Sequence, residues 1–367
     1  MKFKVLAVLV AASAASLANA AEIYNKDSNK LDLYGKVVAR HYFSDNNNID
    51  GDATYVRFGF KGQTQINDSL TGYGQWEYNI QANNSEGSDA QSGNKTRLGF
   101  AGLKFAQFGS IDYGRNYGVV YDVAAITDTP IIFDDETFSY SDNFLTGRGN
   151  GMLTYRNTDF FGLVDGLKFA LQYQGANNEG TANGTSNGRK ARQSNGDGYG
   201  LSASYDIGYD ISVLGAYASS RRTSGQNDMV QGEGERADIW ATGLKYDDGH
   251  LYLAATYAKA NNLTPIKDIA KTDLGFANKS ENLEVVAKYN FDNGLTPEVG
   301  YFRSKGKDLN NNVGDQDILH YWDFSLAYYL NKNMNVYVDY KLNRINKDNS
   351  LNLPSDDQTG VGLTYQF

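Results

Sequence analysis

The stretch from Tyr113 to Gly151 carries many carboxylates and lacks the regular alternation of its neighbours. Its acidic side chains are Asp122, Asp128, Asp134, Asp135, Glu136 and Asp142, with Arg115 and Arg148 near its ends. A connection this long inside a compact chain is usually functional or disordered. Apolar residues such as Val119, Ile126 and Phe144 argue against disorder. We therefore expect an ordered acidic loop packed against another part of the chain.

Four basic residues that lie on the polar faces of the alternating segments could face the carboxylates of this loop. They are Lys36, Arg57, Arg97 and Arg148. Loop carboxylates facing these cations across a narrow opening would set up a strong transverse field. Small polar solutes would then pass according to size and charge. For one arginine alone, local pairing with a carboxylate such as Glu77 explains its presence equally well. The four together favour a constriction.

The segments that must position these residues alternate with period two, the pattern of half-buried strands. In 30–43, Leu31, Leu33 and Val37 share one face, and Lys36 lies on the other. The same alternation is clear in 54–66, 71–81, 283–291, 322–330 and 336–342. The chain is therefore predicted to be all-β.

Short and long connections alternate along the chain between these segments. Short ones fall near 67–68, 107–110, 162–166, 206–210, 247–249, 292–293 and 331–333. Long polar ones fall near 44–53, 82–96, 114–147, 175–198, 219–238, 259–282, 304–318 and 343–358. Seven short and eight long connections join about sixteen strands, an even number of the kind that outer-membrane barrels use.

Charge decides which face of the strands lies inside. The polar faces carry Lys, Arg, Glu and Gln in nearly every strand, too much charge for a dry core. The apolar face must then touch lipid, and only a closed barrel lets strands cross hydrocarbon with every backbone group paired. Aromatic residues beside the short turns are typical of an interfacial girdle. They are Phe105, Phe108, Phe160, Phe161, Tyr246, Phe291, Tyr328 and Tyr329. We expect a 16-stranded antiparallel transmembrane β-barrel with short periplasmic turns and long extracellular loops.

The two ends of the chain agree with export to an outer membrane. Residues 1–20 combine a basic start, an apolar run and an Ala18-Asn19-Ala20 ending, which predicts a cleaved signal peptide and a barrel domain over 21–367. Cleavage leaves 32 basic against 43 acidic residues, a formal charge of −11 that argues against nucleic-acid binding. The last strand alternates up to Phe367, an ending that resembles the signal recognised by barrel-assembly machinery.

The alternatives are a substrate-specific channel and an outer-membrane barrel enzyme. An enzyme would need a base beside a nucleophile or an acidic pair. Of the three histidines, His41 is expected on the lipid face near a strand end, His250 follows a short turn, and His320 is expected to open a strand without an obvious Ser or Asp partner. Without cysteine, and with so few histidines, we expect no cofactor and no transition-metal site. A substrate-specific channel would need an aromatic slide or a cationic ladder, and neither is clear.

Several motifs resemble the trimeric general porins of enterobacterial outer membranes. They are AEIYNKDSNKLDLYGK at 21–36, LTGYGQWEYNIQ at 70–81, DYGRNYGVVYDV at 112–123, GMLTYRNTDFFGLVDGLKFALQYQG at 151–175 and the final TYQF. The likeness covers the whole chain and weakens mainly in the long loops. It implies a sixteen-stranded barrel, a homotrimer in outer-membrane lipid and lipopolysaccharide, passive diffusion of small hydrophilic solutes and ions, and an inward-folded third loop.

The resemblance also assigns roles to single residues. It places the basic side of the constriction on Lys36, Arg57, Arg97 and Arg148, with Lys95 close by, and the first loop carboxylate on Asp128. It further implies that the second loop latches onto a neighbouring subunit through Glu86, with Arg115 as partner.

The tip of the third loop departs from the family pattern. Where the family has Pro-Glu-Phe-Gly-Gly-Asp, this chain has Ile131-Ile132-Phe133-Asp134-Asp135-Glu136. Ile132 thus stands in place of the second constriction glutamate. We expect Asp134, Asp135 or Glu136 to take over its role and to make the opening narrower and more acidic. The net charge favours a mild preference for cations.

Overall fold

The computed structural model describes residues 21–47, 49–133, 136–179 and 189–367, and one antiparallel sheet dominates them. Of its 18 strands, 16 form the wall, and two short ones, β1 (Ala21–Lys26) and β3 (Gly51–Asp52), lie beside β2. The wall strands are β2 (Asn29–Phe43), β4 (Tyr55–Asn67), β5 (Leu70–Gln81), β6 (Lys95–Phe105), β7 (Ser110–Tyr117), β8 (Arg148–Asn157), β9 (Leu167–Gln174), β10 (Gly198–Gly208), β11 (Ile211–Arg221), β12 (Arg236–Asp247), β13 (Leu251–Asn261), β16 (Lys279–Tyr289), β17 (Leu295–Leu309), β18 (Gly314–Asn331), β19 (Met334–Asn343) and β20 (Gln358–Gln366). The predicted strand number is confirmed.

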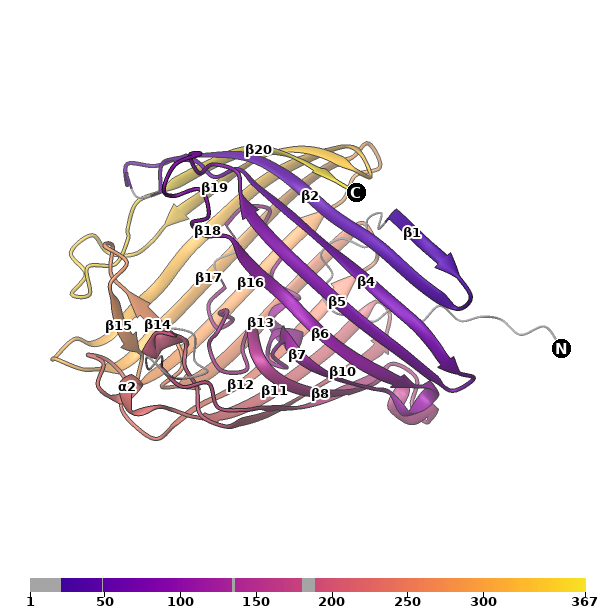
Figure 1. The fold of residues 1–367 in the computed structure, drawn as a ribbon. Coiled ribbons are helices and arrows are strands. Elements are labelled where there is room, and N and C mark those ends of the chain that lie inside the picture. The colour runs from indigo at the N-terminus through magenta and orange to yellow at the C-terminus, as the bar shows by residue number, and fades with distance from the viewer. Residues whose placement is uncertain (1–20, 48, 134–135, 180–188) are drawn as a thin grey trace.

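The sheet closes because the last wall strand pairs with the first. β20 runs antiparallel to β2, with Val37 opposite Tyr365, and the ladder ends with reciprocal backbone bonds of 2.9 Å between Gly35 and Phe367. Beyond that point β1 takes over the same edge of β2, with Ala21 opposite Leu33 (Figure 1). Closure leaves no long unpaired edge in the wall.

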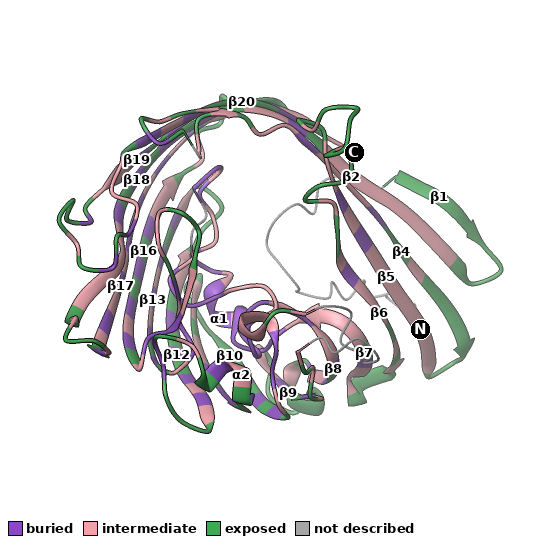
Figure 2. Ribbon diagram, turned by 60° about the vertical axis from the view of Figure 1, so that its left-hand side comes forward, coloured by how far each residue is buried: buried purple, intermediate pink, exposed green. Residues whose placement is uncertain are grey.

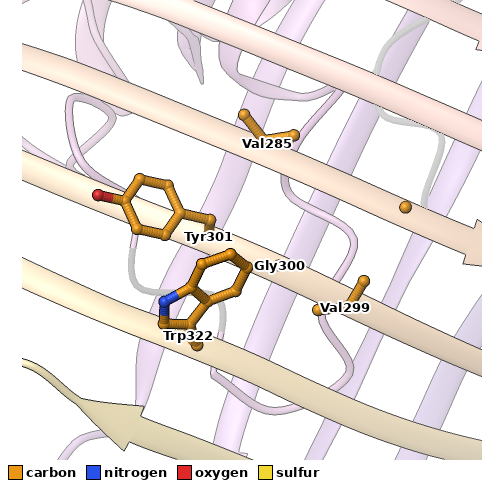
Figure 3. A pocket seen from close by; sticks show the side chains of 6 residues that line it. Val285, Val299, Gly300, Tyr301 and Trp322 are labelled. Atoms are coloured by element: carbon orange, nitrogen blue, oxygen red, sulfur yellow. The ribbon is translucent and has the colours of Figure 1, made fainter.

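Side chains alternate across the wall as predicted. On β16 the inward Glu284 is fully buried, while its neighbours Leu283 and Val285 are exposed on the outside. Large apolar residues cover the outer face all round, and seven of the eight predicted girdle aromatics are exposed, Tyr246 being half-buried. A shallow hollow of about 280 Å³ on this face is lined by Val285, Ala287, Val299, Gly300, Tyr301 and Trp322 (Figure 3). The outer surface is therefore suited to hydrocarbon.

Seven of the eight predicted long connections are longer than every short turn, and the eighth is not. The seven short turns lie at one end of the barrel and the other eight connections at the opposite end, where the connection at 310–313 is as short as a turn. The predicted loop 304–318 is wrong in its bounds, because β17 continues to Leu309 and β18 begins at Gly314. Polar pairs such as Arg303–Asp317 (2.9 Å) let these strands continue beyond their apolar stretches.

Short helical turns and one small hairpin complete the chain. They are η1 (Ala106–Phe108), α1 (Tyr121–Ala124), η2 (Asp159–Gly162), η3 (Ala191–Gln193), α2 (Ser224–Asn227) and the hairpin of β14 (Pro265–Lys267) with β15 (Asp273–Phe276). No helix in the described ranges is long and apolar enough to cross a membrane.

The long loops beyond β13, β17 and β19 share a small hydrophobic core of their own. Ile266, Leu309, Leu351 and Leu353 are buried together there. The ion pair of Arg192 with Asp273 (2.8 Å) ties the hairpin of β14 and β15 to the loop before β10. This end of the barrel is thus built from interlocked loops rather than independent ones.

The outward orientation of Val285 can be tested by charging it. Val285→Lys places an ammonium on the lipid face and is expected to destabilise the barrel by roughly 2–4 kcal/mol, the cost of a cation near the bilayer midplane. Val285→Leu is the control and should change stability far less. Reversible urea unfolding from lipid vesicles measures both. Equal stability of the two variants would contradict the outward assignment.

Candidate functional site: a loop-narrowed channel

The long acidic loop after β7 folds into the barrel instead of projecting from its end. α1 packs against β11 and β12 inside the ring of strands (Figure 2). Val120, Val123 and Ala124 of this turn are fully buried against the inner wall. The wall is lined there by small residues, namely Ala216, Ala218, Ala237, Ala241, Ala258 and Ala260. Small side chains on these strands leave the volume that the loop fills.

Two glycines show how closely the loop approaches the wall. A Cβ on Gly243 of β12 would lie 2.7 Å from Cδ1 of Ile126, and a Cβ on Gly360 of β20 would lie 2.5 Å from Cδ1 of Ile132. A Cβ at either position would force the isoleucine side chain that faces it to shift. Ile132 is accordingly buried at 4% exposure beside Phe133, Ala327 and Tyr337. The residue standing in place of the family's glutamate therefore points at the wall and not into the channel.

The fully buried carboxylate of Glu284, on β16, accepts hydrogen bonds from two separate parts of the third loop. Its Oε1 accepts from the backbone N–H of Thr137 at 2.6 Å and from the Thr137 hydroxyl at 2.8 Å. Its Oε2 accepts from the hydroxyls of Thr127 and, at 3.3 Å, Thr256 on the neighbouring strand. One side chain thus holds residues 127 and 137 against the wall.

Further carboxylates continue this anchoring along the next strands. Glu298 of β17 accepts from the hydroxyl of Thr129, and Asp339 of β19 accepts from the backbone N–H of Ile132 at 2.9 Å. Tyr321 of β18 donates to the carbonyl of Phe133 at 3.0 Å. The loop is therefore hydrogen-bonded to each of the four neighbouring strands β16, β17, β18 and β19.

The predicted basic residues line the opposite wall. Strand register places Lys36 opposite Arg57, Arg57 opposite Asn79, and Asn79 opposite Lys95, so that these residues form one row across β2, β4, β5 and β6. Arg97 lies at the adjacent β-bulge, where an extra residue re-aims its neighbours. The sequence-predicted cations are brought together.

The remaining basic residues have identifiable partners. Arg97 Nε donates to Glu77 Oε1 at 2.5 Å. Arg148 donates to the Ser141 hydroxyl at 2.7 Å, and its guanidinium carbon lies 5.5 Å from the centre of the Tyr117 ring. Local pairing with Glu77 is thus correct for Arg97 alone among the four.

The loop carboxylates are used in different ways. Asp122 pairs with Arg156 at 2.8 Å, and Asp142 pairs with Arg115 at 2.6 Å. Asp128 accepts from the Tyr121 hydroxyl; burial and this neighbouring charge raise the pKa of Tyr121, so the hydroxyl keeps its proton. Glu136 is half-buried in the loop. Asp134 and Asp135 lie outside the described residues.

Several residues of this site were not identified from the sequence. Glu284, Glu298 and Asp339 hold the loop, and Arg156 holds Asp122. The available signal was their inward position on alternating strands. Alternation shows that a carboxylate points inward, but not that a distant loop covers it.

The histidines lie apart from this constriction. The expectation that His320 opens a strand is wrong, because it lies within β18, where Nδ1 is 3.2 Å from an Asp317 carboxylate oxygen. His250 Nε2 is 3.0 Å from Asp292 at the short turns. No group of three or more acidic or histidine side chains in the described ranges is arranged to hold a metal ion.

A closed transmembrane barrel narrowed by an inward loop defines a channel protein. Residues 26–367 match the family described as Gram-negative porin, and the chain belongs to this family. It forms a channel of the bacterial outer membrane.

Individual relatives match over the full length. Outer membrane porin N of Escherichia coli K12 is 55% identical over 383 residues, covering 100% of both chains, and outer membrane protein F of Serratia marcescens is 55% identical over 381 residues with the same coverage. The structure of Salmonella typhi OmpF in complex with daunomycin is 48% identical, has a TM-score of 0.86 and covers 95% of this chain and 100% of that one. A trimer form of Vibrio cholerae OmpT, 15% identical with a TM-score of 0.63, covers 93% and 100% and supports the fold alone.

Loss of the Glu284 carboxylate should loosen the loop. Glu284→Ala strips acceptors from Thr127 and Thr137 in a buried place, which is expected to cost about 2–4 kcal/mol of stability and to increase open-channel current noise. Glu281→Ala, on the outer face of the same strand, loses exposed ion pairs to Lys259 and Lys307 and should cost under about 1 kcal/mol. Urea unfolding and single-channel recording measure both effects. Wild-type current noise and stability in Glu284→Ala would show that Glu284 does not hold the loop against the wall.

Proposed function

We propose that this porin mediates passive diffusion of small hydrophilic solutes and ions, filtered at the opening between the third loop and the basic wall, with a weak preference for cations. The observation that carries the proposal is the loop's fixed position opposite the row of Lys36, Arg57 and Lys95. A loop hydrogen-bonded to four strands sets a constant size limit. Opposite charges on its two sides orient dipolar solutes as they pass.

The cation preference rests on the loop carboxylates and on the formal charge of −11 after signal cleavage. Asp122 and Asp142 are ion-paired and contribute little to it. The sequence assigns the acidic side of the constriction to Asp128, Asp134, Asp135 and Glu136. Charges on the outer loops act weakly, because salt screens them within about 10 Å at 0.1 M.

Neutralising the loop should lower the cation preference. Asp128→Asn combined with Glu136→Gln is expected to shift the reversal potential in a KCl gradient toward that of an anion-preferring channel. Asp348→Asn, an exposed charge in the last long loop, should leave the potential unchanged. The same measurement on Asp134→Gly with Asp135→Gly asks whether the tip carboxylates contribute. An unshifted potential in the Asp128 and Glu136 double variant would refute the assignment of selectivity to the loop.

The alternative functions predict different experimental results. A substrate-specific channel would show conductance that saturates with one sugar or oxyanion, whereas the general channel conducts in proportion to concentration. A barrel enzyme would turn over a lipid or peptide substrate. The relatives that match the whole chain carry porin names, which favours a non-enzymatic channel.

We further propose a homotrimer in which Glu86 binds Arg115 of a neighbouring subunit. Glu86 is exposed in the second long loop and forms no ion pair among the described residues. Arg115 is held within its own chain by Asp142 and by Asn150 Oδ1 at 2.6 Å. An incoming carboxylate would join or displace Asp142 on the guanidinium. The likeness to trimeric porins supports this arrangement.

Charge reversal at the latch tests the trimer. Glu86→Arg is expected to lower the temperature at which the trimer dissociates by a few degrees, since about 1 kcal/mol corresponds to roughly 2–4 °C in domains of 150–250 residues. Asp348→Arg, which reverses an exposed charge in the last long loop, is the control for charge alone. Trimer and monomer bands on mild detergent gels report the transition. A Glu86→Arg trimer as heat-stable as the control would exclude the latch.

We also propose that the outer surface of the barrel contacts outer-membrane lipid and lipopolysaccharide. The outer ends of β13, β16 and β17 carry Lys259, Lys279 and Lys305 above the apolar band, each paired with a carboxylate. Lysine ammonium groups at this level are placed to meet the phosphates of lipopolysaccharide, with acyl chains on the apolar face below. Export would use the signal peptide over residues 1–20, which lie outside the described residues.

A further inference from the structure

A second cationic feature lies beside the predicted constriction and was not anticipated from the sequence. Arg40, on the inner face of β2, lies between two aromatic rings. Its guanidinium carbon is 5.1 Å from the centre of the Tyr42 ring and 5.1 Å from that of Tyr55. Its Nε donates to the carbonyl of Ala53 at 3.3 Å. The terminal nitrogens of this arginine keep their capacity to donate to a solute.

Tyr55 gathers three cations around one ring. Besides Arg40, the Lys36 ammonium lies 5.9 Å and the Arg57 guanidinium carbon 5.4 Å from its centre. Strand register explains the convergence, because Tyr55 of β4 stands opposite Val38 of β2. Lys36 and Arg57 follow on the constriction side of the ring, and Arg40 follows on the side of the long loops. The ring itself is buried at 9% exposure and attracts each cation near it through its π face.

Among the described residues the cations of this cluster form no direct ion pair, and Glu77, which is bonded to Arg97, acts on Arg57 without contacting it at salt-bridge distance. Within the described ranges, no carboxylate lies at salt-bridge distance from Lys36, Arg40 or Arg57. Two other arginines of the inner wall each have a carboxylate partner, Arg97 with Glu77 and Arg156 with Asp122. Three like charges held around one ring repel one another unless an anion joins them.

We propose that Lys36, Arg40 and Arg57 form a subsite around Tyr55 that retains multivalent oxyanions, such as the phosphate groups of small phosphorylated solutes, on their way through the channel. Guanidinium groups present paired N–H donors that match phosphate oxygens, and Lys36 adds a point charge. Arg40 lies nearest the long loops, so an entering anion meets it before Arg57. The inference rests on the proposed function, since it requires an open channel.

The location also links the subsite to the third loop. The Tyr42 ring that stacks near Arg40 lies 5.8 Å from the ring of Phe133, next to the loop tip. A solute held by Arg40 would therefore stand at the entrance to the narrowest part. A weak overall preference for cations and a local anion subsite are compatible, because the first describes monovalent current and the second describes residence.

Block by inorganic pyrophosphate tests the subsite in the full mature protein. Pyrophosphate is added to the long-loop side of single channels in KCl, and the concentration that halves the current is determined. For Arg40→Leu we expect this concentration to rise at least about fivefold, and for Arg40→Lys about twofold, because charge remains but the paired donors are lost. Lys61→Gln is the matched control: it removes one inner-wall cation whose ammonium lies 5.1 Å from a single ring, that of Tyr34.

The outcomes separate the two proposals. A half-block concentration that stays within twofold of wild type in Arg40→Leu, or that rises equally in Lys61→Gln, would overturn the subsite. So would an open wild-type channel that pyrophosphate does not block. Absence of channels in wild type would instead overturn the proposed function. Heat-modifiable migration on gels confirms that each variant has folded, and Arg40→Gln replaces Arg40→Leu if the latter does not.

Discussion

The need to pair every backbone N–H and C=O group away from water governs this structure. In hydrocarbon an unpaired group costs several kcal/mol, so strands can cross only as a closed ring. Closure is achieved where β20 and β1 share the edge of β2. Once the ring is closed, period-two geometry divides every strand into a lipid face and an inner face. The channel follows from that division, because the inner face carries the charge.

The third loop solves a second problem of the same kind. A long segment inside the barrel brings its own backbone polar groups into a confined space, where they need partners. Glu284 and Asp339 supply acceptors for the backbone N–H groups of Thr137 and Ile132, and Glu298 takes a threonine hydroxyl. Gly243 and Gly360 supply the room. The carboxylates on this half of the wall thus serve mainly to hold the loop, while Lys36, Arg40 and Arg57 on the other half form no ion pair among the described residues.

How far the sequence predicts the structure depends on the range of the interaction. Alternation predicts the strands, the outer face and the inward direction of Lys36 and Arg57, since each needs only neighbours along the chain. It does not predict that Glu284 bonds to residues 127 and 137, because that contact joins segments about 150 residues apart through the barrel's register. Ile132 is a similar case: its burial depends on the missing side chain at Gly360. The cluster around Tyr55 needs the β2–β4 register as well.

Solvent access along one strand tests the division into two faces most directly. The chain contains no cysteine, so single cysteines placed from Leu201 to Asp206 of β10 are the only thiols present. A small water-soluble thiol reagent, applied to the protein in lipid vesicles, should label positions 204 and 206 and spare 201, 203 and 205, with the spared positions reacting with a lipid-soluble reagent instead. Position 202 is left out of the series, because Ser202 is buried beneath the third loop, where its hydroxyl donates to Asp122. Uniform labelling, or labelling of 201 and 203 by the water-soluble reagent alone, would contradict a barrel with lipid outside and water inside.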